Sequence, residues 1–175
     1  MKFVALLRGI NVGGKSRVEM SRLKHVFETL GCEEVKTYIN SGNVVFGSRQ
    51  KLEPSVVEDA VEREFGVRAK VLLIDATSFR AVNDAIDAAW QNDTQQRTDV
   101  MFLWPEVDDA SILEKISIHP EFEAARHVPG ALIWNIQRQF VTRGGAIKLI
   151  KTDAYRQMTI RNCNTVRKLV QLLDS

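Results

Sequence analysis

Short apolar runs alternate along this chain with segments of helical period, and this alternation restricts the fold to sheets with helices packed against them. The first run, from Lys2 to Arg8, is continuously apolar between its ends, which predicts a central strand buried on both faces. A helix is predicted next, with Ser21 as its N-cap and Gly31 directly after its end. The segment from Val35 to Phe46 is predicted to be a tight hairpin or a bulged strand, because four turn-forming residues interrupt it.

The same two patterns continue through the first half of the chain. Pro54 lies in the first turn of a second predicted helix, where its missing N–H does least harm, and Gly66 ends that helix. A buried strand is predicted from Ala69 to Ile74, followed by a helix from Phe79 to Trp90. These elements complete one set of strands and helices before the composition changes.

The polar stretch from Asn92 to Arg97 is the predicted boundary between an N-terminal half, residues 1–97, and a C-terminal half, residues 98–175. We expect the two halves to pack as one compact unit. In the second half we predict a strand at 100–104, a helix at 108–116, an irregular or short helical connection at 119–126, and strands at 131–136 and 139–142. An amphipathic stretch at 146–155 and a helix at 165–173 capped by Asn164 follow. This order predicts the α+β class: two sandwiches with mixed sheets and helices packed on one face of each.

Composition places the chain among ordinary globular proteins. Its 175 residues are 45% apolar and 26% charged, so it can bury a core without a disulfide or a metal. No apolar run approaches the roughly 20 residues that span a bilayer, and the run ended by Arg8 is too short for a signal peptide. We therefore expect a soluble, cytoplasmic protein in which Cys32 and Cys163 are reduced thiols.

Charge is distributed unevenly, although the net charge is only +2. Residues 1–50 carry 8 Lys and Arg against 4 Asp and Glu, residues 51–120 carry 7 against 14, and residues 121–175 carry 9 against 4. If the two basic ends meet in space, their field attracts an anion such as a nucleotide or an RNA. The alternative is that both ends pair with the acidic middle.

Three motifs carry a resemblance to a known family: Leu6-Leu7-Arg8-Gly9-Ile10-Asn11-Val12-Gly13-Gly14-Lys15, then Thr37-Tyr38-Ile39-Asn40-Ser41-Gly42-Asn43-Val44-Val45-Phe46, and finally Arg161-Asn162-Cys163-Asn164-Thr165-Val166-Arg167-Lys168-Leu169. The chain resembles the bacterial family known as domain of unknown function 1697. The resemblance implies two α/β-plait-like (ferredoxin-like) units and no particular activity, cofactor or substrate. Two departures occur in the C-terminal half: Cys163 stands where the family usually has Trp, and Gly145 to Leu149 replaces a Gly-Ser-Lys-Leu type of stretch.

The segment from Gly9 to Ser16 matches the phosphate-binding pattern G-x-x-x-x-G-K-[ST], and a predicted strand precedes it as that motif requires. A second strand, ending at Asp75, resembles the one that supplies a magnesium ligand in such proteins. The context argues against this interpretation, because a phosphate-binding loop runs straight into its helix at the Lys-Ser pair. Here the predicted helix begins only near Ser21.

Two other interpretations of the glycine-rich loop stay open. Its donors, together with a second donor-rich turn, are typical of an anion or nucleotide site of a different kind. The candidate ligand-binding residues are Arg8, Asn11, Gly13, Gly14, Lys15, Asn40, Ser41, Gly42 and Asn43. Alternatively, glycine and asparagine are present only because the turns need their backbone conformations.

A second basic cluster occupies the C-terminal half and comprises Arg138, Arg143, Lys148, Lys151, Arg156, Arg161, Arg167 and Lys168. Phosphate binding is its functional interpretation, with Trp134, Phe140 and Tyr155 as aromatic residues that could stack on bases. A solvated charged face is the alternative. The three tryptophans, Trp90, Trp104 and Trp134, are more typical of core anchors than of stacking platforms.

The histidines His25, His119 and His127 have no metal-ligand spacing, and no catalytic motif is present in the sequence. We therefore assign no catalytic residue, metal or cofactor. The leading hypothesis is a protein that binds a phosphate-bearing ligand, a nucleotide or an RNA segment, through the glycine-rich loop. One alternative is a small transferase or hydrolase that acts on a phosphorylated metabolite. Another is an oligomerising or partner-binding module.

Overall fold

The computed structural model describes residues 1–14 and 17–175 of the chain. They form two compact units: residues 1–79 with 169–175, and residues 80–168. Two helices, α3 (Ala76–Asp84) and α4 (Cys163–Asp174), run from one unit into the other. No helix in the described part of the chain is long and apolar enough to cross a membrane. A boundary after residue 97 between two halves that pack as one compact unit stays a prediction.

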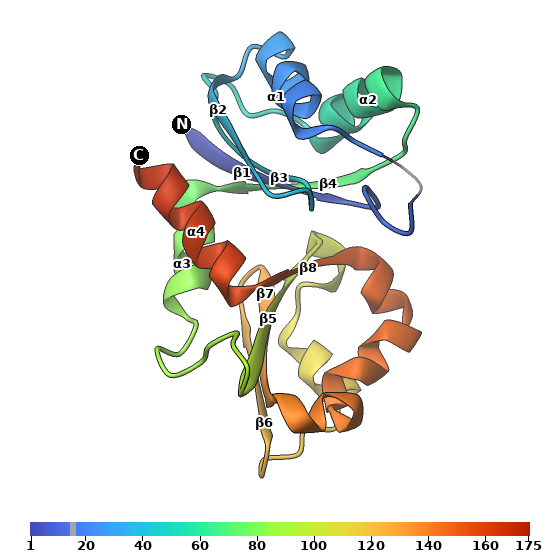
Figure 1. Ribbon diagram of the computed structural model, residues 1–175, viewed down its shortest axis with the longest axis vertical. Helices are drawn as coiled ribbons and strands as arrows, with labels where there is room; N and C mark the ends of the chain where they lie inside the picture. Colours follow the sequence, from blue (N-terminus) through green and yellow to red (C-terminus); the bar gives the residue numbers. More distant parts are fainter. Residues whose placement is uncertain (15–16) are drawn as a thin grey trace. The chain divides into compact units, whose positions relative to one another are not determined.

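The first unit is a four-stranded sheet with two helices. In chain order its elements are β1 (Lys2–Arg8), α1 (Met20–Thr29), β2 (Glu33–Tyr38), β3 (Asn43–Gly47), α2 (Pro54–Phe65) and β4 (Lys70–Asp75). The strand order is β2-β3-β1-β4, and every neighbouring pair is antiparallel. Figure 1 shows α1 and α2 on the same face of this sheet. The order and the connections are those of a ferredoxin-like unit.

The apolar pattern explains why these residues form this unit. The middle of β1 is buried on both faces, as Val4 and Leu6 on one face and Ala5 on the other are all 0–1% exposed. Phe27 of α1 packs against Phe46 of β3, with ring centroids 5.1 Å apart. Helix α1 begins one residue before Ser21, the predicted N-cap, and Glu19 takes that place.

The second unit repeats the strand order with short 3-10 helices in place of α-helices. Its elements are β5 (Gln96–Leu103), η1 (Pro105–Val107), η2 (Ala110–Lys115), β6 (Glu123–Val128), β7 (Ala131–Gln137), η3 (Arg138–Arg143), η4 (Gly145–Lys151), η5 (Asp153–Gln157) and β8 (Met158–Asn162). The order β6-β7-β5-β8 is again fully antiparallel. In Figure 1 the orange segments that follow β7 lie on one face of this sheet.

The predicted α+β class with two ferredoxin-like units is therefore confirmed, but both sheets are antiparallel rather than mixed. Strand β6 was not predicted, and the predicted helix at 108–116 and strand at 139–142 are both built of 3-10 turns. Helix α3 covers 76–84 instead of 79–90. Helix α4 begins at Cys163, and its N-cap is Asn162 instead of Asn164, because the Asn162 Oδ1 accepts from the Thr165 N–H at 2.9 Å.

Candidate functional site

The glycine-rich loop after β1 and the turn between β2 and β3 lie at the same end of the first sheet. Leu6 of β1 is paired with Asn43, the first residue of β3, so both connections leave the sheet at that end. The Asn11 Nδ2 donates to the backbone oxygen of Asn40 at 2.8 Å, and the Leu7 N–H donates to the Gly42 oxygen at 2.8 Å. The two segments that the sequence predicts as one site are therefore in direct contact.

Asn11 holds the loop in its shape. Its Nδ2 also donates to the Val18 oxygen at 2.9 Å, and its Oδ1 accepts from the Val18 N–H at 2.7 Å. Both amide hydrogens of Asn11 are thus used within the protein, and its backbone is in the left-handed region with φ 53°. Asn11 bonds both the N–H and the oxygen of buried Val18, seven residues later, and this closes the loop at its base.

The residues of the β2–β3 turn are also used to build the structure. Asn43 is fully buried, and its Nδ2 donates to the Tyr38 oxygen at 2.9 Å and to the Ser41 Oγ at 3.0 Å. Gly42 has φ 77°, and a Cβ there would come within 2.7 Å of side-chain atoms of Leu7 and Ile10. Glycine is therefore required at position 42 by its conformation and by close packing.

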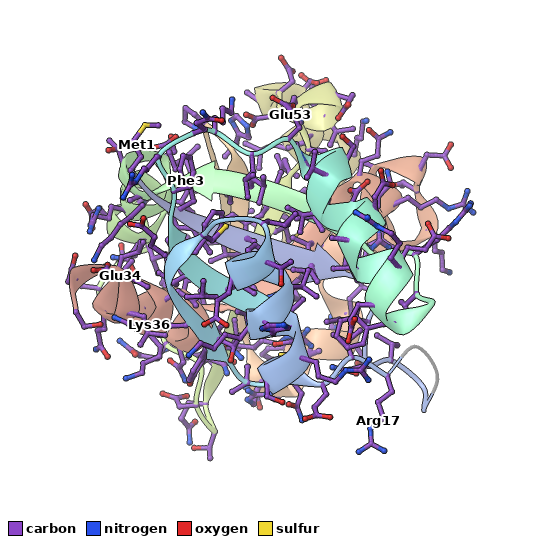
Figure 2. All side chains as sticks on the ribbon, turned by 90° about the horizontal axis from the view of Figure 1, so that it is seen from above. Met1, Phe3, Arg17, Glu34, Lys36 and Glu53 are labelled. Carbon is purple, nitrogen blue, oxygen red and sulfur yellow. The ribbon has the colours of Figure 1, made fainter. Side chains whose placement is uncertain are left out.

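The tip of the glycine-rich loop is exposed to solvent. Gly13 and Gly14 have φ 62° and 71°, and a Cβ on either would meet no atom within 4 Å. Arg17 is exposed, and Figure 2 shows its side chain pointing away from the ribbon. Arg8, at the end of β1, is half-buried. Lys15, which the sequence places in this site, and Ser16 lie outside the described residues.

The surroundings of the tip differ from a phosphate-binding loop of the G-x-x-x-x-G-K-[ST] type. Helix α1 begins at Met20 rather than at the Lys-Ser pair, and β4 runs antiparallel to β1. Asp75 lies at the far end of the sheet, paired with Phe3, and its carboxylate accepts from the N–H and Oγ of Ser78. These hydrogen bonds, the backbone one first, lower the pKa of Asp75, whose side chain caps the start of α3 at the end of the sheet away from the loop.

Ile39, in the β2–β3 turn, has a backbone conformation that is unusual for its side chain. Its φ is 47° and it is 49% exposed. A β-branched residue in the left-handed region is a strained outlier, and such strain is concentrated at functional sites and switch regions. Val12 in the neighbouring loop is 68% exposed. Both connections at this end of the sheet thus present an apolar side chain to solvent.

Several basic residues of the C-terminal cluster have partners within the second unit. Arg143 lies over the rings of Phe122 and Phe140, with its Cζ 5.4 and 5.6 Å from the two centroids. Arg167 donates to the Trp90 oxygen at 2.9 Å, and Arg161 is only 7% exposed. Trp134 is 2% exposed, as predicted for a core anchor, whereas Trp90 and Trp104 are half-buried.

The remaining titratable candidates do not form a catalytic or metal centre in the described part of the chain. No three His, Cys, Asp or Glu side chains there are placed to hold a metal ion. The His127 Nε2 lies 2.9 Å from the Asp108 Oδ1, and the other oxygen of Asp108 accepts from the Gly130 N–H, so this pair fastens the β6–β7 hairpin. Both cysteines are free and buried, and burial raises the pKa of each thiol, that of Cys32 to about 11.

Sequence reasoning missed a charged pair in the second unit. Arg97 and Asp99 follow one another on the same face of β5, and both line a small cavity beside Trp134. Arg97 was assigned to the polar boundary segment, and Asp99 was not assigned at all. A signal was present in the sequence: Arg97, Asp99, Met101 and Leu103 are spaced two residues apart, which places all four on one face of a strand.

Comparisons with known proteins agree with the fold and with the two N-terminal motifs. A family model described as "Protein of unknown function (DUF1697)" matches residues 1–134. Among solved structures, the chain is similar to the conserved bacterial protein SP0830 from Streptococcus pneumoniae, with 28% identity, a TM-score of 0.79 and 98% of each chain covered. No curated protein matches.

Proposed function

The chain belongs to the DUF1697 family of proteins of unknown function, and from its own geometry we propose that it binds a phosphate-bearing ligand at the tip of the loop between β1 and α1. The observation that supports this is the exposed Gly13-Gly14 pair, followed by the exposed Arg17, in a loop whose base is fixed by the contacts of Asn11. Backbone N–H groups in turn conformations form concave sites for anions, and arginine adds forked donors that match phosphate oxygens.

The loop contacts divide the predicted site residues into two groups. Asn11, Gly42 and Asn43 set the backbone, since their polar groups or their missing side chain are used inside the protein. The ligand would meet the exposed Gly13, Gly14 and Arg17, and Lys15, outside the described residues, stays a predicted contact. Of the nine candidate ligand-binding residues, the proposal therefore assigns ligand contact only to those at the tip of the loop, and the others fix the base of the loop.

Binding is a better account of this loop than phosphoryl transfer. A transferase or hydrolase needs a titratable group within hydrogen-bond reach of the reacting phosphate. The sequence identifies no residue for that role, and Asp75, which it offers only as a magnesium ligand, lies at the opposite end of the sheet and caps α3. The oligomerising alternative rests on Val12 and Ile39, and two exposed apolar side chains are far from a contiguous patch of several hundred Å².

Isothermal titration calorimetry at low salt tests the proposal with tripolyphosphate, ATP and a short single-stranded RNA. The variant Lys15→Ala with Arg17→Ala should bind about ten-fold more weakly, because it removes two cationic donors. Arg49→Ala is the matched control: its side chain is 88% exposed, and it follows β3 at the other end of the sheet. Tighter binding of ATP than of tripolyphosphate would indicate a nucleotide, and preference for the oligomer would indicate RNA.

Affinity should fall as salt is added, because exposed phosphate contacts are screened. The proposal is wrong if none of the three ligands binds, or if Arg49→Ala weakens binding as much as the double substitution does.

A further inference from the structure

A small cavity lies inside the second unit, between its sheet and the 3-10 segments η4 and η5. Its volume is about 140 Å³. Most of its wall is apolar and comes from the three strands and from η4, for example Met101, Trp134, Leu149 and Ile160. An apolar cavity of roughly this size, about 150 Å³, is large enough to hold benzene. The cavity as a whole therefore fits a group of about six carbon atoms.

Two charged side chains complete the wall. Asp99 is on the central strand β5, and its side chain is only 7% exposed. Its Oδ2 accepts from the Arg97 Nε at 2.8 Å and lies 2.7 Å from the Arg97 Nη2. The Arg97 side chain is 40% exposed and lies over the ring of Trp134, 5.9 Å from the centroid. The cavity thus has an ion pair that reaches from its interior to solvent.

The second oxygen of Asp99 has no partner within residues 1–14 and 17–175. Both contacts of Arg97 go to Oδ2. Because Asp99 lines the cavity, its Oδ1 is the carboxylate oxygen that remains for a ligand there. An ionised acceptor forms its strongest hydrogen bonds with a charged donor. A ligand that brings a cationic donor would satisfy it.

We propose that this cavity binds a small molecule with an ammonium group on an aliphatic chain of four to six carbons. The ammonium donates to the Asp99 Oδ1, and the aliphatic chain occupies the apolar part beside Trp134 and Leu149. An aliphatic α-amino acid matches all the groups present, because its carboxylate can accept from the exposed guanidinium of Arg97. A zwitterion also leaves the paired charges of Arg97 and Asp99 balanced, whereas an aliphatic acid without an amine places its carboxylate near that of Asp99.

The test compares three ligands of similar shape on the full chain by isothermal titration calorimetry. L-Leucine carries both charges, isoamylamine only the ammonium, and isovalerate only the carboxylate. We expect binding of leucine and of isoamylamine, the former more tightly, and no binding of isovalerate. Equal binding of leucine and isoamylamine would assign the site to simple amines and still support the Asp99 contact. Binding of isovalerate as tight as that of isoamylamine, or no binding of either amine at millimolar concentration, would overturn the proposal.

Two variants connect the binding to this cavity. Asp99→Asn keeps the shape of the side chain and should weaken leucine binding about ten-fold or more, because it removes a charged acceptor. Glu106→Gln, at an exposed position of η1, is the matched control and should bind as the parent does. Unchanged affinity in Asp99→Asn would overturn the proposal.

Ala146→Phe fills the cavity and should abolish binding. If that variant does not fold, the position of the ligand can be followed in the parent by NMR instead. The indole N–H of Trp134 donates to Glu123 at 2.8 Å, and its ring lines the cavity, so its resonance should shift on addition of leucine. A Trp134 resonance unaffected at saturating leucine would place the binding elsewhere and overturn the assignment.

Discussion

The Gly145 N–H donates to both carboxylate oxygens of Glu123, at 3.0 Å each. The same carboxylate, 4% exposed, accepts from the His119 N–H at 2.9 Å and from the Trp134 Nε1 at 2.8 Å. One buried side chain on the edge strand β6 therefore fixes the start of η4, the connection before β6 and a core tryptophan of β7. Charge-assisted bonds of this kind are about twice as strong as neutral ones, which explains a carboxylate in the core.

Replacing Gly145 by alanine should strongly destabilise the second unit. A Cβ at this position would lie 2.2 Å from the backbone oxygen of Ser117, and backbone cannot move aside as a side-chain end can. We expect the free energy of unfolding, measured with urea, to fall by about 3 kcal/mol. Gly47→Ala, where the nearest atom would be 3.4 Å away, is the control and should cost about 1 kcal/mol or less. Equal losses would contradict the assigned clash.

Glu123→Gln tests the carboxylate itself. The amide nitrogen would face donors that now point at an oxygen, so we expect a loss of about 2–3 kcal/mol in the free energy of unfolding. Glu121→Gln, two residues earlier with a 66% exposed side chain, should change it by less than about 0.5 kcal/mol. A loss no larger than that of Glu121→Gln would show that the three donors find other partners.

The first unit could be predicted from the sequence because its signals are local. The apolar run of β1, Pro54 at the start of α2 and Gly66 with φ 66° at its end each act through the backbone or through near neighbours. The second unit depends on distant partners. From the sequence alone a glutamate such as Glu123 is expected at the surface, because its partners Trp134 and Gly145 are distant in the chain. Strand β6 was therefore not predicted.

The same reason limited the prediction of sites. The contact between the glycine-rich loop and the Asn40 turn follows from strand direction, and the sequence indicates it. Thr98 and Asp99 are buried polar residues, and their hydrogen-bond partners include Gln91, Asn135 and Arg97. Because polarity alone suggests a surface segment, part of β5 was interpreted as a linker and the cavity beside it was not foreseen.

Substitutions at Asn11 should separate its two roles. Asn11→Gly keeps the left-handed backbone but loses the three side-chain hydrogen bonds to Val18 and Asn40, which predicts a loss of about 2 kcal/mol. Asn11→Ala also forces a Cβ into the left-handed region and should cost about 1 kcal/mol more. Urea unfolding of both variants measures the difference. Equal stabilities would show that the backbone at position 11 relaxes to negative φ.

The buried thiol of Cys32 should make stability depend on alkaline pH. Burial raises its pKa from 9.0 to about 11, so the folded protein keeps a proton that the unfolded chain loses. This contribution to stability is complete below pH 9 and is lost as the pH rises from 9 towards 11. The free energy of unfolding should decline less over that range in Cys32→Ala than in the parent. Parallel pH profiles would contradict the shift, since all other groups are common to both proteins.

Ile39 offers the opposite experiment, in which a substitution stabilises the protein. The left-handed conformation costs a β-branched residue about 1–2 kcal/mol, and asparagine tolerates it better. Because Ile39 is 49% exposed, Ile39→Asn gives up only part of an apolar contact and should raise the free energy of unfolding by about 0.5–1 kcal/mol. Val56→Asn, on the exposed side of α2 and 42% exposed, is the control for loss of a surface aliphatic group and should not stabilise.

The turn at Ile39 keeps its strained backbone because residues outside the turn contact Asn40 and Gly42. The Asn40 oxygen accepts from the Asn11 Nδ2, and Gly42 is packed against Leu7 and Ile10, so the turn cannot relax alone. If that is correct, Ile39→Asn should raise the free energy of unfolding by less in an Asn11→Gly background. In that background the contact from Asn11 to Asn40 is missing, so the turn can move and release the strain. Identical gains in both backgrounds would show that the strain at Ile39 is independent of the loop.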